Sequence, residues 1–144
     1  LINENINLLS ELDKSITISF KSNFDSVFLE CDNEQLSRVF LNLIKNSIES
    51  IKQKSQNTSN FKKNITIELN DNDSQINVII TDNGIGFSNY NRNVKELLNP
   101  YITTKKNGTG LGLSIVNKIV NDHNGKIEFI QIAEGAKIKI TFIK

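Results

Sequence analysis

This 144-residue chain has little of what marks several large classes of protein. A single cysteine, Cys31, excludes a framework of internal disulfide bonds and suits a reducing compartment. No apolar run approaches the roughly 18 residues that a membrane span needs, so we expect no direct membrane contact from this fragment. The 17 basic residues balance 16 acidic ones without forming a basic patch, and nothing predicts nucleic-acid binding. Because the chain starts at Leu1 rather than methionine, we expect it to be a piece of a longer protein.

The length fits one α/β domain that can bury a core of its own. Residues 1–13 carry apolar side chains at helical spacing but are too few for a stable isolated helix, so residues 1–14 are interpreted as the end of a longer helix or a linker. Residues 15–20 alternate apolar and polar side chains, which predicts a half-buried strand, and we expect a second short strand at residues 27–30.

A long helix is predicted from residue 33 to about residue 54, because Asp32 or Asn33 can cap its first turn. At about 100° per residue, its apolar side chains share one broad face with Ser47. Asn42 and Asn46 lie together at the edge of that face. Two interpretations stay open for this pair: the amides line a cleft, or they are solvated side chains in an asparagine-rich chain.

Residues 81–87, with the sequence TDNGIGF, follow an apolar run at 76–80 that is typical of a buried strand. A carboxylate at Asp82 can accept hydrogen bonds from a ligand amine, and Gly84 and Gly86 let the backbone approach a ligand without a Cβ. The alternative is a plain Asp-Asn-Gly turn that closes a hairpin.

The other predicted strands form hairpins. Residues 65–69 alternate and are expected to pair antiparallel with the run at 76–80. Residues 126–130 and 136–142 form a last hairpin that turns at Gly135.

A polar segment, residues 88–107, contains the only proline, Pro100, and at most one helical turn at 94–98. Such a length with so little regular structure indicates a functional lid or disorder. The glycine-rich run GTGLGL at 108–113 then opens a helix that ends at Asn124 and Gly125.

Glycines before a helix favour phosphate binding, because free backbone N–H groups and the helix dipole attract an anion. The spacing excludes a Walker loop, and a dinucleotide-binding fold would need these glycines directly after a strand. A hinge for the lid remains an alternative role. Asn46 can offer an oxygen to Mg²⁺, which prefers oxygen ligands and is commonly carried by nucleotide phosphates with few protein ligands.

Residues 42–46, 82–86 and 108–113 resemble the N, G1 and G2 boxes of the GHKL ATPase/kinase superfamily, in the same order. Residues 15–144 are similar to the catalytic, ATP-binding domain (HATPase_c) of sensor histidine kinases. Three local features, at residues 48–51, 100–105 and 135–136, are most similar to the NtrY/NtrB nitrogen-regulation type. Two positions depart from the pattern: Glu49 stands where many of these kinases have lysine, and Asn124 replaces a glycine, a swap that a helix C-terminus tolerates.

The resemblance implies an α+β fold, the two-layer α/β sandwich called the Bergerat fold, with a mixed sheet of about five strands, three helices on one face and a mobile ATP lid at about 88–107. It implies ATP and Mg²⁺ as cofactors. By position, it implies that Asp82 binds the adenine amine and that Gly84 and Gly86 shape the pocket around it. Asn46 would ligate Mg²⁺, and Asn42 would line the phosphate side. Lys105 would contact the terminal phosphate, and the phosphates would be held by the glycine-rich run, namely Gly108, Thr109, Gly110, Leu111 and Gly112.

The family transfers the phosphoryl group to a histidine on a separate dimerisation domain, and a response regulator acts downstream. The only histidine here, His123, is expected to be structural, so this chain is interpreted as the ATP-holding half of a cytoplasmic kinase region. The alternatives are a GHKL-type ATP hydrolase, a non-catalytic nucleotide-binding module and a serine kinase of the anti-sigma type. Hydrolases of this kind carry a glutamate as general base at the position of Asn42, whose amide has no useful basicity.

Overall fold

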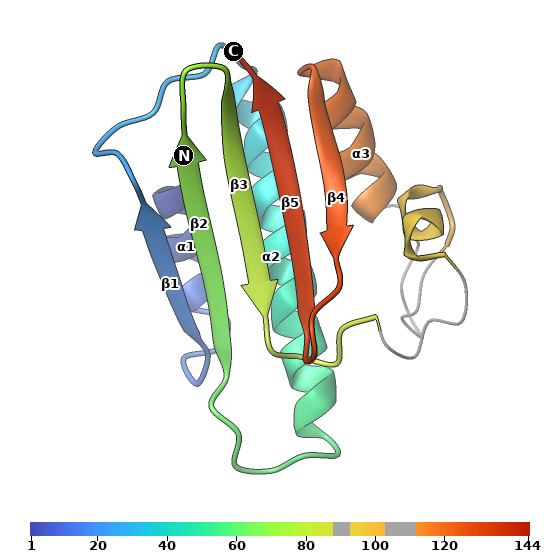
Figure 1. Cartoon of the computed structure of the whole chain (residues 1–144). Coiled ribbons are helices and arrows are strands. Elements are labelled where there is room, and N and C mark those ends of the chain that lie inside the picture. The colour runs from blue at the N-terminus through green and yellow to red at the C-terminus, as the bar shows by residue number, and fades with distance from the viewer. Residues whose placement is uncertain (88–92, 103–111) are drawn as a thin grey trace.

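The computed structural model describes residues 1–87, 93–102 and 112–144 (Figure 1). Its helices and strands follow the order expected from the hydrophobic patterns. The elements are α1 (Ile2–Ser10), β1 (Thr17–Ser22), α2 (Asn33–Ser55), β2 (Asn64–Asp71), β3 (Gln75–Asp82), the 3₁₀ helix η1 (Val94–Leu98), α3 (Gly112–Asp122), β4 (Gly125–Ile130) and β5 (Ala136–Ile143).

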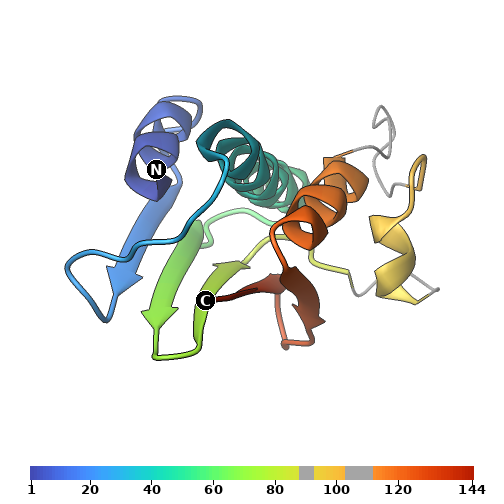
Figure 2. The same cartoon turned by 90° about the horizontal axis from the view of Figure 1, so that it is seen from above.

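The five strands form one mixed sheet in the order β1-β2-β3-β5-β4. Strands β1 and β2 are parallel, whereas every other neighbouring pair is antiparallel. Helices α1, α2 and α3 cover one face of the sheet, as the view in Figure 2 shows. The predicted two-layer α/β sandwich, its five-stranded mixed sheet and the two hairpins are therefore confirmed.

The core lies between α2 and the face of the sheet that the helices cover. Alternate residues of each strand point to that face, so Ile67, Ile80 and Ile138 form one cross-strand row of buried side chains. The apolar face predicted for α2 is buried in full against them. Its buried residues are Leu36, Val39, Phe40, Leu43, Ile44, Ser47, Ile48 and Ile51.

Helix α2 begins where the sequence places its cap. The Asp32 carboxylate accepts a hydrogen bond from the backbone N–H of Gln35, at 3.0 Å. The backbone N–H of Asp32 in turn donates to Nε2 of His123, at 3.1 Å, and Nδ1 of His123 contacts the carbonyl of Ile119 at 2.8 Å. Both ring nitrogens of His123 thus tie the end of α3 to the start of α2, which agrees with a structural role.

One predicted strand is wrong. Residues 27–30 keep their alternation, with Val27 and Leu29 half-buried and Phe28 and Glu30 exposed, but they form no strand. The reason is the lack of a partner: β1 pairs only with β2, and residues 27–30 cross the end of the sandwich instead of joining an edge. None of the helices in the described ranges is long and apolar enough to cross a membrane.

Candidate functional site

Asp82 is the last residue of the central strand, β3, and its side chain points to the helical layer. Its register partners are Ile65 on β2 and Ala136 on β5, so strands flank it on both sides. Only 5% of its surface is exposed. A carboxylate this deeply buried is costly to keep charged, and such groups occur where they are paired or hydrogen-bonded.

Burial raises the pKa of the Asp82 carboxyl, and three hydrogen-bond donors oppose this shift. The backbone N–H of Gly84 donates to Oδ1 at 2.9 Å, and the Ser47 hydroxyl and the Ala136 N–H also donate to the carboxylate. The charge of Lys54 lowers the pKa further. Because an ionised carboxylate has about four acceptor positions, three donors leave room for one more, such as a ligand amine.

The segment after β3, residues 83–87, is called the glycine turn below, and α2 holds it in place. The backbone N–H of Ile85 donates to the carbonyl of Ser50 at 3.3 Å, and the N–H of Gly86 donates to the Ser50 hydroxyl at 3.4 Å. A Cβ on Gly84 would stand 2.6 Å from the carbonyl carbon of Ser50. The glycine at 84 therefore serves a close approach between the turn and a helix.

Two further glycines lock the turn to the β4–β5 connection. Gly86 has φ +63° and Gly135 has φ +84°, the left-handed region that glycine tolerates best. A Cβ on Gly86 would lie 2.7 Å from the carbonyl carbon of Gly135, and one on Gly135 would lie 2.7 Å from the carbonyl carbon of Asp82. The contacts found at Gly84 and Gly86 are thus packing contacts within the protein, and through them the glycines fix the backbone beside Asp82.

The two asparagines of α2 lie in the helical layer, toward which the Asp82 side chain points, and both are half-buried. The side-chain Nδ2 of Asn42 donates to the carbonyl of Arg38 at 2.9 Å. A Cβ on Gly112, the first residue of α3, would lie 3.5 Å from Oδ1 of Asn42. The structure therefore brings together the N-box residue Asn42 and the glycine that starts α3, which are 70 positions apart in the sequence.

Several predicted site residues lie outside the described residues, namely Lys105, Gly108, Thr109, Gly110 and Leu111, together with residues 88–92 and 103–107 of the proposed lid. The described part of that segment, residues 93–102, contains η1, which confirms the predicted helical turn. Its Leu97 is buried, with 3% of its surface exposed. Phe87, just before this segment, packs edge to face against Phe129 on β4, and the two ring centroids are 5.4 Å apart.

Sequence reasoning did not assign the residues that hold Asp82 and its turn. Ser47 appeared only as a hydroxyl on an otherwise apolar helix face, and that position was the available signal for a buried polar partner. Ser50 and Lys54 carried no such signal. The Lys54 ammonium donates to the carbonyl of Asn83 at 3.0 Å and lies over the ring of Phe61, 4.6 Å from its centroid.

The chain's own acidic residues do not form a metal centre in the ranges that the structure describes, which contain no group of three His, Cys, Asp or Glu side chains suited to a metal ion. The amide oxygen of Asn46, half-buried on α2, has the chemistry of a neutral ligand for a divalent cation.

Known proteins are similar to this chain in sequence and in fold. Residues 31–144 match the family described as histidine kinase-, DNA gyrase B- and HSP90-like ATPase. Over 132 residues the chain is 37% identical to a putative sensor histidine kinase NtrY-like protein of Rickettsia conorii. This alignment covers 91% of the chain and 21% of that protein. Over 105 residues it is 38% identical to the sensory histidine kinase/phosphatase NtrB of Azospirillum brasilense, covering 68% of this chain and 26% of that protein.

Among solved structures, the catalytic domain of the histidine kinase ThkA superimposes with a TM-score of 0.83 at 27% identity, covering 99% of this chain and 90% of that one. The chain spans 21–22% of the length of the NtrY-like relatives. With 114 of its 144 residues inside the family match and the fold of a histidine kinase catalytic domain, the chain belongs to the histidine kinase-, DNA gyrase B- and HSP90-like ATPase family.

Proposed function

We propose that this chain is the ATP-binding catalytic domain of a sensor histidine kinase. It holds ATP with Mg²⁺ and transfers the terminal phosphoryl group to a histidine on a dimerisation domain of the same full-length protein, from which a response regulator receives it. The observation that carries the proposal is the buried carboxylate of Asp82, which three donors hold at the end of the central strand.

Asp82 is the proposed reader of the base. An adenine amine is a neutral donor, and a carboxylate held in one orientation by Gly84, Ser47 and Ala136 selects a donor over an acceptor at the same position. The glycine turn supports this role because its contacts with Ser50 and Gly135 leave the carboxylate little freedom to rotate away.

The phosphates would lie toward α3. Asn42 and Gly112 are neighbours there, and the start of α3 supplies the positive end of a helix dipole. We propose that Gly108, Thr109, Gly110 and Leu111 complete this phosphate site, with Lys105 on the terminal phosphate and residues 88–107 acting as a mobile lid.

Mg²⁺ is proposed to bind to the phosphates with Asn46 as its ligand from the protein. When bound, the ion would neutralise charge on the phosphates. The part played by the chain is to present the Asn46 oxygen from a rigid helix, one residue before Ser47, so that base and phosphates are positioned from the same turn of α2.

An acceptor on another domain is favoured because His123 is already engaged. Its two ring nitrogens contact backbone groups of Asp32 and Ile119. Hydrolysis is disfavoured because Asn42 replaces the glutamate expected of a hydrolase. We further propose that residues 1–14, whose helix α1 packs on α2 through Asn5, Ile6 and Leu9, continue from the dimerisation helix and that the domain lies in the cytoplasm.

The test is phosphoryl transfer between separate chains. The isolated chain should bind Mg-ATP but neither hydrolyse it appreciably nor label itself. Mixed with a dimerisation domain that carries an acceptor histidine, it should label that histidine with acid-labile, base-stable phosphate. Transfer should be slow, because the effective concentration supplied by a covalent tether is absent.

A matched control uses the same dimerisation domain with its acceptor histidine changed to glutamine, which should remain unlabelled. Brisk release of phosphate by the chain alone would contradict the kinase assignment in favour of a hydrolase. Binding of Mg-ATP without transfer to any histidine-bearing domain would favour a nucleotide-binding module.

A further inference from the structure

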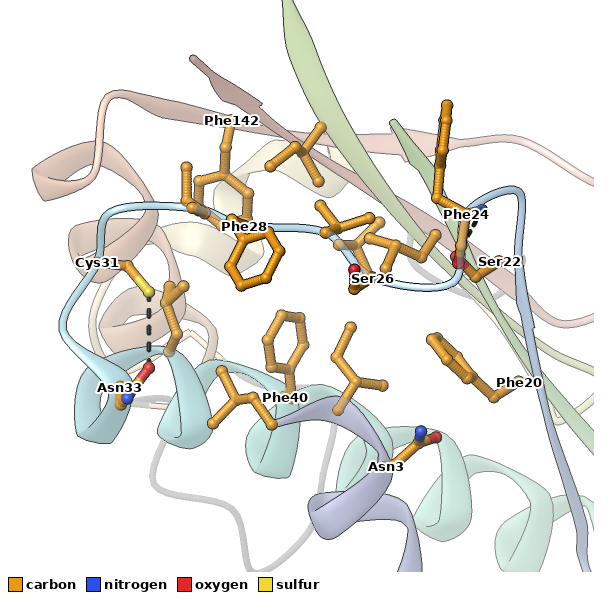
Figure 3. Close-up of a pocket in the computed structure, with 18 of the residues that line it drawn as sticks. Asn3, Phe20, Ser22, Phe24, Ser26, Phe28, Cys31, Asn33, Phe40 and Phe142 are labelled. Carbon is orange, nitrogen blue, oxygen red and sulfur yellow. Dashed lines mark hydrogen bonds between the residues drawn. The ribbon is translucent and has the colours of Figure 1, made fainter. Parts of the chain in front are cut away.

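A cavity lies at the end of the sandwich opposite Asp82. Its volume is about 430 Å³, and it lies between the sheet and the starts of α1 and α2 (Figure 3). Strand β3 runs away from this cavity, since Ile76 and Val78 line it and Asp82 ends the strand at the far side. Residues 23–32, called the strap below, cross over it between β1 and α2.

The lining of this cavity is mostly apolar and rich in aromatic rings. Phe40 from α2 and Phe142 from β5 are buried, with 3% and 1% of their surface exposed, and Phe20 from β1 and Leu69 from β2 add to the lining. The polar groups around it are small and neutral apart from Asp25 on the strap. Burial raises the pKa of the Cys31 thiol, so this lining group stays neutral at physiological pH.

Hydrogen bonds hold the strap at its two ends. Asn23 exchanges side-chain hydrogen bonds with the backbone of Asp71, at 3.0 and 3.2 Å, and the N–H of Asp32 donates to His123 at 3.1 Å. Between these ties, no hydrogen bond joins residues 25–30 to another part of the chain that the structure describes. The middle of the strap is therefore held by side-chain packing, such as that of Leu29 against the core, and not by hydrogen bonds.

We propose that this cavity is a second ligand site, which takes one small, uncharged, ring-bearing apolar molecule between the rings of Phe40 and Phe142 and the strap. A volume of 430 Å³ falls within the roughly 300–1,000 Å³ typical of small-molecule sites. Apolar walls favour an uncharged ligand, because a charged group would lose its hydration without gaining a partner. The proposal does not depend on the function proposed for the nucleotide end.

The strap does not fill the cavity with its own side chains. Phe28 stands at the mouth with 86% of its surface exposed, while its neighbours Leu29 and Cys31 pack against the core. Successive residues of an extended segment point to opposite sides, so Phe28 turns inward only if Leu29 turns outward.

A folded partner is hindered by the strap, which crosses the cavity. The ties at Asn23 and Asp32 hold both ends of the strap against the domain, so the cavity admits a single small molecule more readily than a helix or strand.

The test titrates the chain with indole, an uncharged aromatic probe, in the presence of saturating Mg-ATP. Methyl NMR signals of Val78 and Leu36, which line the cavity, should shift in a saturable way, whereas those of Val116 in the α3 core should not. Benzoate, a charged ring of similar size, should bind at least tenfold more weakly.

Two tryptophan variants give the matched control. Leu29→Trp places a ring inside the cavity and should weaken indole binding at least tenfold, whereas Glu30→Trp adds the same ring on the opposite side of the strap and should change it less than twofold. If Leu29→Trp fails to fold by circular dichroism, Cys31→Phe replaces it.

The proposal would be overturned by the absence of a saturable shift at the lining methyls or by equal binding of indole and benzoate. It would also be overturned by unchanged binding in both cavity-filling variants, or by contacts between the Phe28 ring and Val78 in the free chain. A concentration-dependent dimer that indole dissociates would equally overturn it, because the occupant would then be a second copy.

Discussion

The glycine turn and the strap are irregular segments at opposite ends of one sheet, and the protein holds them in opposite ways. Residues 83–87 are fixed along their length by Ser50 and Gly135, with no room for a Cβ at Gly84 or Gly86. Residues 23–32 are fixed at two ends, and their middle covers a cavity of about 430 Å³. Both segments connect regular elements, but only one is packed as tightly as the core.

This contrast has a physical reason at the nucleotide end. Positioning a buried carboxylate requires donors that do not move, because an acceptor that rotates freely gives little selectivity for one ligand edge. At the other end, the cavity is lined mostly by apolar side chains, and a loosely tied connection costs little. The local free energy of opening is therefore expected to be high around Asp82 and low in the strap.

The largest expected effect comes from breaking the lock between the turn and the β4–β5 connection. Gly135→Ala places a Cβ against the Asp82 carbonyl at a residue with φ +84°. A left-handed alanine costs about 1–2 kcal/mol and overpacking about 1–3 kcal/mol, so the free energy of unfolding should fall by roughly 2–5 kcal/mol in urea melts.

The matched control is Gly112→Ala, because the added Cβ would meet Asn42 Oδ1 only at an ordinary contact distance of 3.5 Å. Its free energy of unfolding should change by less than about 0.5 kcal/mol. Equal effects of the two variants would mean that the glycine turn is not locked in the way described here.

A second test removes the carboxylate itself. Asp82→Ala should weaken ATP binding by about ten- to a hundredfold, since a hydrogen bond to a charged group contributes roughly 1.5–3 kcal/mol. Isothermal calorimetry measures the change, and circular dichroism verifies the fold. Asp25→Ala, in the strap, removes a carboxylate from the other end of the sheet and should leave the affinity unchanged; an equal loss there would remove the base-reading role from Asp82.

Asn46→Ala tests the metal site with a smaller expected effect. Mg²⁺ should increase the ATP affinity of the variant about tenfold less than it does for the wild type, because one neutral ligand is lost; this corresponds to roughly 1.4 kcal/mol. Adenosine binding should stay the same. Calorimetry with and without Mg²⁺ separates the two. Equal losses for adenosine and Mg-ATP would indicate damage to α2 instead of loss of a ligand.

The pH dependence of stability gives a further test of the buried carboxyl. Burial raises the pKa of Asp82 in the folded state above its ordinary value of 3.8, so between the two pKa values the folded state binds more protons than the unfolded state. Stability from this group is therefore lost as pH rises through that window. The donors from Gly84, Ser47 and Ala136 oppose the shift, which keeps the effect small.

Asp82→Asn removes this titration. The free energy of unfolding of the variant, minus that of the wild type, should increase as pH rises from about 4 toward neutral, as measured by urea melts across that range. A difference that is flat with pH would show that the Asp82 carboxyl has the same pKa in both states.

The sequence predicted the elements whose pattern is local. The alternation at 65–69 and 76–80, the apolar face of α2 and the single helical turn at 94–98 all appear where expected. Alternation alone also predicted a strand at 27–30, which is wrong because a strand needs a partner edge, and that partner depends on where β1 and α2 lie in the fold.

The same limit applies to the candidate site. Asp82 and Asn42 could be selected from their motifs, whereas the partners of the glycines could not. Gly84 packs against Ser50, 34 residues earlier, and Gly86 against Gly135, 49 residues later. A glycine in a sequence indicates close approach of something to the backbone, but whether that is a ligand, a helix or another turn is decided by tertiary packing.

The smallest expected effect belongs to the strap, and it tests whether that end is as loosely held as its contacts indicate. Phe28→Ala removes a large ring, but 86% of the surface of Phe28 is already exposed. The free energy of unfolding should therefore change by less than about 0.5 kcal/mol. Phe40→Ala removes the same ring from the floor of the same cavity, where only 3% is exposed, and should cost about 3–5 kcal/mol. Paired urea melts measure both. A loss from Phe28→Ala comparable to that from Phe40→Ala would mean that Phe28 is buried in solution, and the strap would then be a packed part of the core like the glycine turn.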